Sequence, residues 1–142
     1  MAEAATTRSW MIPVWGLFVA AFAVATAELI IAGLLPNVAA DLNVDIPTAG
    51  LLITGYALGV AIIGPILALV TATLPRRALL LGLVAIFVVG NCICAVSASY
   101  WMLLGARLVI ACCHGLFFGV AIVMASRLAP DGRQTSAISV VV

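Results

Sequence analysis

The sequence predicts an all-α membrane protein built as a bundle of transmembrane helices. Of its 142 residues, 66% are hydrophobic and only 8% are charged, whereas soluble domains carry about 25% charged residues. Four apolar runs are each long enough to cross a hydrocarbon core about 30 Å thick. Because so few polar residues cannot cover a water-exposed surface, we expect the lipid bilayer to surround these helices.

Short polar segments separate the apolar runs and set the expected limits of the helices. Pro36 is expected to end the first helix. After the polar segment RLAPDGRQT, a further apolar run begins near residue 136 and is too short to cross a bilayer. We expect this run to be the start of a fifth span in a longer chain; the alternative is an amphipathic tail at the membrane surface. The four complete spans are expected at about 10–35, 49–70, 78–98 and 101–126.

The positions of the arginines predict the orientation of the chain. All six positively charged residues are arginine, and five lie in the N-terminal segment or in alternate loops, whereas the other two loops contain none. Under the positive-inside rule, this split places the N-terminus in the cytoplasm. These five residues are Arg8, Arg76, Arg77, Arg127 and Arg133.

Ionisable residues interrupt the first and fourth spans at Glu28, Arg107 and His114. Such a residue costs about 2.5–3.5 kcal/mol near the centre of a membrane helix, so it is expected to face a partner or a cavity. Measured from Leu35 and Trp101, Glu28 and Arg107 lie about 10 Å and 9 Å below the same membrane surface. The sequence therefore predicts a Glu28–Arg107 ion pair, either as a static support or as part of a functional site.

Other polar residues are candidates for the same region. His114 lies seven residues after Arg107, so both side chains share one face of the helix. It is expected to serve as a charge partner or cavity residue, or else as a hydrogen-bonded packing residue. Asn91 and Tyr56 are further candidates for lining a cavity. Glu28 is the only acid within the four expected spans, which makes it the candidate carrier of a proton.

Two G-x-x-x-G patterns, Gly55–Gly59 and Gly115–Gly119, predict close packing between helices. They do not by themselves indicate a dimer interface.

Several other classes of protein are not supported by the sequence. A net charge of +1 gives no basic field for nucleic acid. No phosphate-binding loop, nucleophile elbow or zinc-protease pattern is present, so we expect no enzyme and no cofactor. The cysteines lie in apolar runs without zinc-type spacing, which predicts neither a disulfide framework nor a metal site. They are Cys92, Cys94, Cys112 and Cys113.

Three stretches together resemble exporters of the major facilitator superfamily, in the drug:proton antiporter branch related to arabinose efflux and chloramphenicol resistance permeases. They are TAELIIAGLLPNVAADLNVDIPTAGLL (26–52), LPRRALLLG (74–82) and SYWMLLGARLVIACCHGLFFGVA (99–121). The family fold has twelve helices in two halves. The resemblance therefore implies that residues 1–142 form part of the N-terminal half, with four helices and the start of a fifth.

The match to the family's motifs is incomplete. The loop between helices two and three usually reads G-x-x-x-D-R-x-G-R-R, of which only the final pair, Arg76 and Arg77, is present. Arg107 matches the arginine that begins the fourth-helix motif, but Ile110 and Ala111 stand where Gln and Gly are usual.

The resemblance implies a secondary active transporter in the bacterial cytoplasmic (inner) membrane. Its expected activity is proton-coupled efflux of small hydrophobic compounds or drugs by alternating access, with Glu28 as the proton-coupling residue. The expected partners are a small-molecule substrate, protons and lipid, and the full-length transporter is expected to be monomeric. Two alternatives are a four-helix dimeric small multidrug transporter and a non-transporting scaffold subunit.

Overall fold

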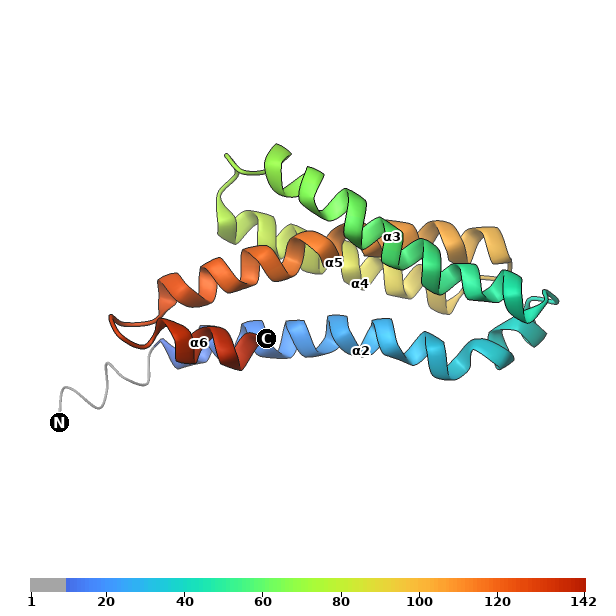
Figure 1. Ribbon diagram of the computed structural model, residues 1–142, viewed down its shortest axis with the longest axis horizontal. Coiled ribbons are helices and arrows are strands. Elements are labelled where there is room, and N and C mark those ends of the chain that lie inside the picture. Colours follow the sequence, from blue (N-terminus) through green and yellow to red (C-terminus); the bar gives the residue numbers. More distant parts are fainter. Residues whose placement is uncertain (1–9) are drawn as a thin grey trace.

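A computed structural model describes residues 10–142, and within this range the chain is helical, with no strand. Helices α2 to α5 are each long and apolar enough to cross a membrane, and they run alternately up and down beside one another (Figure 1). The predicted all-α bundle is therefore confirmed; Arg8 lies outside the described residues. The helices are α2 (Met11–Asp41), α3 (Ile46–Val70), α4 (Arg76–Ala95), α5 (Tyr100–Leu128) and α6 (Gln134–Val141).

The prediction that Pro36 ends the first helix is wrong, because α2 continues through it to Asp41. Proline already has a helical φ, so it interrupts one backbone hydrogen bond without forcing the helix to stop. The chain turns instead at Asn43, whose φ of 55° is a conformation that asparagine tolerates. Asp45 then caps α3, since its Oδ1 accepts a hydrogen bond from the Thr48 amide at 3.3 Å.

The other helices begin slightly before the expected spans. α3 begins at residue 46 rather than 49, and α4 begins at residue 76 rather than 78, so Arg76 and Arg77 form its first turn. At α5, the Ser99 hydroxyl accepts from the Met102 amide at 3.3 Å. The differences arise because apolar runs mark the part of a helix within lipid, whereas caps and first turns use polar residues.

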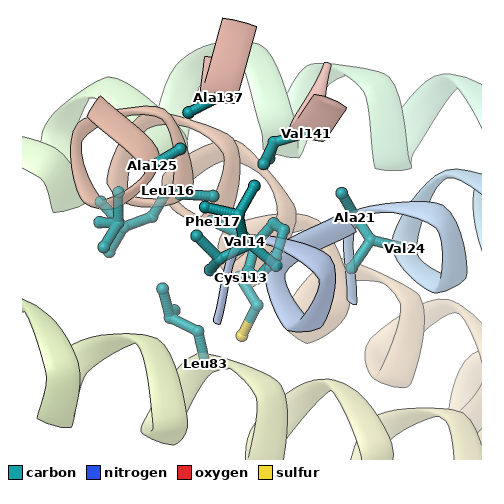
Figure 2. Packing of buried hydrophobic residues seen from close by; sticks show 13 residues of the cluster. Val14, Ala21, Val24, Leu83, Cys113, Leu116, Phe117, Ala125, Ala137 and Val141 are labelled. Carbon is teal, nitrogen blue, oxygen red and sulfur yellow. The ribbon is translucent and has the colours of Figure 1, made fainter. Parts of the chain in front are cut away.

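Helix α5 lies at the centre of the bundle and packs against α2, α3, α4 and α6. Phe117, only 2% exposed, lies within an apolar cluster that joins α5 to α2, α4 and α6. Because α5 is buried on several faces, it sets the positions of the other helices. Figure 2 labels residues of this cluster: Val14, Ala21, Val24, Leu83, Cys113, Leu116, Phe117, Ala125, Ala137 and Val141.

Close packing between α3 and α5 depends on small residues. A Cβ atom at Gly64 would lie 2.9 Å from the Gly115 Cα, and one at Gly59 would lie 2.9 Å from the Ala111 Cβ. The prediction of tight helix packing is therefore confirmed. The residues at the contact differ from the two patterns, because Gly64 belongs to neither and Gly119 would meet no described atom within 4 Å.

The arginines outside the apolar spans share one end of the bundle in the described part of the chain. The α3–α4 and α5–α6 turns lie at the same end as the start of α2 (Figure 1). Four arginines flank these turns, while Asp41 and Asp45 lie at the opposite end. The four are Arg76, Arg77, Arg127 and Arg133.

Candidate functional site

Two polar side chains, from α3 and α2, approach one imidazole nitrogen of a histidine on α5. The Nδ1 atom of His114 on α5 lies 2.8 Å from the hydroxyl oxygen of Tyr56 on α3. The same nitrogen lies 3.6 Å from Oε2 of Glu28 on α2. Since α2, α3 and α5 all pack against one another, this group lies where the three helices converge.

The group lies at mid-height in the bundle. From their bounds, α2 is centred on residue 26, α3 on residue 58 and α5 on residue 114. Glu28 and Tyr56 are each two residues from their helix centres, and His114 is at its own. In membrane transporters, substrate and coupling-ion sites lie near this level.

Burial differs sharply within the group. The side chain of Glu28 is 42% exposed, whereas that of His114 is 12% exposed and Tyr56 is almost completely buried. The ring of Phe118 covers another part of His114, with ring centroids 5.1 Å apart. The carboxylate is therefore the accessible member, and its partners lie behind it.

Arg107 does not form the ion pair that helix depth predicted, because no Glu28–Arg107 contact within 4.0 Å occurs among residues 10–142. Its Nε donates to the Leu52 carbonyl at 3.1 Å, and its guanidinium lies 4.6 Å from the centre of the Tyr56 ring. This cation–π contact and the hydrogen bond tie α5 to α3.

The extension of α2 beyond Pro36 explains the difference. Glu28 lies 13 residues before the end of α2 (41 − 28), about 20 Å, whereas Arg107 lies 7 residues after the start of α5 (107 − 100), about 10 Å. The two side chains are therefore at different levels. His114, a further seven residues along α5, is at the level of Glu28 and is its observed partner.

A cavity of about 450 Å³ lies beside Arg107, between α2, α4 and α5. Its walls are mainly apolar, with Asp41, Asn91 and Arg107 among the polar lining residues. Arg107 is 6% exposed, and its Nη2 has no hydrogen-bond partner in the described part of the chain. Asn91 and Arg107 line this cavity, whereas Tyr56 contacts Arg107 and is not among the lining residues.

Sequence reasoning missed the contact between Tyr56 and His114. Each lies next to a glycine of a G-x-x-x-G pattern, Gly55 and Gly115, and this proximity was a usable signal that both face a close helix contact. Arg76, by contrast, begins α4 at the end of the bundle, away from the Glu28 group.

The chain has relatives among known membrane transporters. Residues 17–142 match the family model of the Major Facilitator Superfamily. The uncharacterized MFS-type transporter YtbD of Bacillus subtilis (strain 168) is 42% identical over 124 residues, covering 87% of this chain and 31% of the relative. The putative transporter AraJ of Escherichia coli (strain K12) is 40% identical over 118 residues, covering 83% of this chain and 30% of the relative.

A third relative, the chloramphenicol resistance protein of Streptomyces lividans, is 36% identical over 129 residues, covering 91% of this chain and 33% of the relative. The chain therefore spans about a third of the length of the curated relatives it matches. No solved structure matches it.

Proposed function

Because this chain belongs to the major facilitator superfamily, we propose that it is part of a secondary active transporter that exports small hydrophobic compounds in exchange for protons. The family match sets aside the four-helix small multidrug transporter as an alternative. In the proposed transporter, residues 1–142 belong to the N-terminal half, and α6 begins a further span. The full-length protein acts as a monomer by alternating access.

The contact between Glu28 and His114 is the observation that carries the proposal of proton coupling. A coupling residue must be reachable by a proton, and its protonation must change the contacts between helices. Glu28 has 42% of its side chain exposed and lies 3.6 Å from His114. Protonation removes the charge of the carboxylate and with it the attraction between α2 and α5 at this level.

The proposed substrate class is supported by the cavity and by a relative. A volume of about 450 Å³ falls within the range of about 300–1,000 Å³ typical of small-molecule sites. Its walls are mainly apolar with a few polar groups, including Asn91 and Arg107, which suits a small molecule with a hydrophobic body. One relative is named a chloramphenicol resistance protein.

We propose that the arginine-rich end of the bundle faces the cytoplasm of a bacterial cell. The variants Asn43→Cys and Leu74→Cys, in the full-length transporter without its native cysteines, test this orientation. In intact cells, a membrane-impermeant maleimide is expected to label residue 43, which lies in the α2–α3 turn, and to label residue 74 only after permeabilisation. The opposite pattern would reverse the proposed topology.

Replacement of Glu28 tests the proposed function. The full-length transporter in proteoliposomes is expected to accumulate substrate against its gradient when a pH gradient is imposed. Glu28→Gln keeps the size of the side chain but cannot ionise, so it is expected to abolish this accumulation while substrate binding persists. Asp131→Asn, which removes an exposed carboxylate in the α5–α6 turn away from the cavity, serves as the control.

Two results would count against the proposal. Proton-driven accumulation by Glu28→Gln would assign the coupling to another residue. An absence of substrate flux in the unaltered full-length protein, over a panel of hydrophobic compounds, would favour the scaffold alternative.

A further inference from the structure

We infer that Tyr56 and Glu28 compete for Nδ1 of His114, so that protonation of Glu28 decides whether α5 is hydrogen-bonded to α3 or to α2 at this level. The inference rests on the proposed role of Glu28 and adds Tyr56 as a positioning residue. It assigns His114 the role of transmitting the protonation state of α2 to α3.

Nδ1 of His114 cannot form a full hydrogen bond to the Tyr56 hydroxyl and to the Glu28 carboxylate at the same time. In the plane of the imidazole ring, Nδ1 carries either a hydrogen or a lone pair. Tyr56 is at hydrogen-bond distance from it, 2.8 Å, whereas Glu28 at 3.6 Å is beyond the usual range. The structure therefore holds the arrangement in which His114 is bonded to α3 and Glu28 stands back.

The two protonation states of Glu28 favour different arrangements. When the carboxyl group is protonated, the lone pair of Nδ1 accepts the Tyr56 hydroxyl. When the carboxylate is ionised, a hydrogen on Nδ1 is the better arrangement, because a charge-assisted hydrogen bond is roughly twice as strong as a neutral one. The Tyr56 hydroxyl then loses its acceptor.

The proton balance of the exchange closes with water alone. The Tyr56 hydroxyl releases Nδ1, and the proton of the Glu28 carboxyl group moves to that nitrogen, which gives a carboxylate and an imidazolium. The imidazolium then loses its Nε2 proton to water. The products are an ionised Glu28 and a neutral His114 whose hydrogen is on Nδ1, and one proton has left the site.

Tyr56 is held so that it does not follow His114 towards Glu28. Its side chain is 2% exposed, and the Arg107 guanidinium lies over its ring. Among the described residues, the titratable groups in contact with His114 are Glu28 on α2 and Tyr56 on α3. On α5, Arg107 contacts the Tyr56 ring, and Cys113 is the chain neighbour of His114. Because the ring is fixed, movement of His114 towards α2 breaks its bond to α3.

Removal of the Tyr56 hydroxyl in the full-length transporter tests the competition. Tyr56→Phe keeps the ring and its contact with Arg107 but removes the bond that favours protonated Glu28. A higher proton concentration is then needed to protonate Glu28 to the same extent. The midpoint of the pH profile of proton-driven transport is expected to move down by about 0.5–1 unit, the effect of one neutral hydrogen bond.

Tyr100→Phe is the matched control. The Tyr100 hydroxyl also joins α5 to α3, donating to the Thr48 carbonyl at 3.0 Å, but it belongs to a different buried cluster from Tyr56. Its removal is expected to leave the pH midpoint unchanged. An equal shift in both variants, or no shift in Tyr56→Phe, would overturn the inference.

The hydrogen on His114 can also be observed directly by ¹⁵N NMR of histidine-labelled full-length transporter. The signal is assigned by its loss in His114→Gln. At one alkaline pH, Nδ1 is expected to carry hydrogen in the unaltered protein and a lone pair in Glu28→Gln. The same tautomer in both, with transport by Glu28→Gln uncoupled from protons, would overturn this inference alone. Proton-driven transport by Glu28→Gln would instead overturn the proposed function.

Discussion

Replacing Gly115 by alanine is expected to destabilise the full-length transporter by about 1–3 kcal/mol, the usual cost of overpacking. The added Cβ would lie 2.8 Å from the Gly64 Cα and 2.8 Å from the Val60 carbonyl oxygen. Both are backbone atoms of α3, so the clash is relieved only by moving α3 away from α5. The separation would also disturb the Tyr56–His114 contact, which bridges the same two helices.

Gly119→Ala provides the control within the same helix. A Cβ at this position would meet no described atom within 4 Å, and alanine is the better helix former, so this variant is expected to be at least as stable as the unaltered protein. Thermal unfolding of the purified transporters in detergent measures both variants. Equal transition temperatures for Gly115→Ala and Gly119→Ala would show that the α3–α5 approach is less close than described.

Glu28→Gln and His114→Gln are each expected to abolish proton-driven accumulation of substrate, because each removes one side of the proposed coupling contact. The two side chains act through one contact of 3.6 Å. The double variant is therefore expected to lose little more activity than either single variant. Proteoliposome transport under a fixed pH gradient measures all three.

Arg107→Gln distinguishes this contact from the ion pair that helix depth suggested. Arg107 binds the Leu52 carbonyl and the Tyr56 ring rather than Glu28. The change in stability caused by Arg107→Gln should add nearly fully to that caused by Glu28→Gln. The changes caused by His114→Gln and Glu28→Gln should not be additive, because these two residues are in contact. If the coupling energy with Glu28 is larger for Arg107 than for His114, the result would support a Glu28–Arg107 ion pair instead.

The bundle could be predicted from the sequence because the solvent determines its main features. A membrane requires long apolar runs whatever their packing partners, so four spans could be recognised from hydropathy. The end of α2 could not be predicted from hydropathy. It depends on the positive φ of Asn43 and the cap at Asp45, and the proline at residue 36 gave a misleading signal for it.

The error at the end of α2 altered the predicted site. With Pro36 as the end of the helix, Glu28 and Arg107 were placed at the same depth. Because α2 extends to Asp41, His114 rather than Arg107 lies at the depth of Glu28. The residues themselves could be recognised because polar side chains are costly within lipid. Their pairing could not, since it depends on the rotation of α5 against α3, which close contacts such as Gly64–Gly115 set.

Substrate-induced proton release tests the central claim, that Glu28 exchanges a proton for substrate, most directly. The full-length transporter, in detergent and a weakly buffered solution with a pH indicator, is mixed with a transported compound. The unaltered protein is expected to release protons on binding, whereas Glu28→Gln is expected to bind the compound without releasing any. Equal proton release by the two proteins would contradict the account.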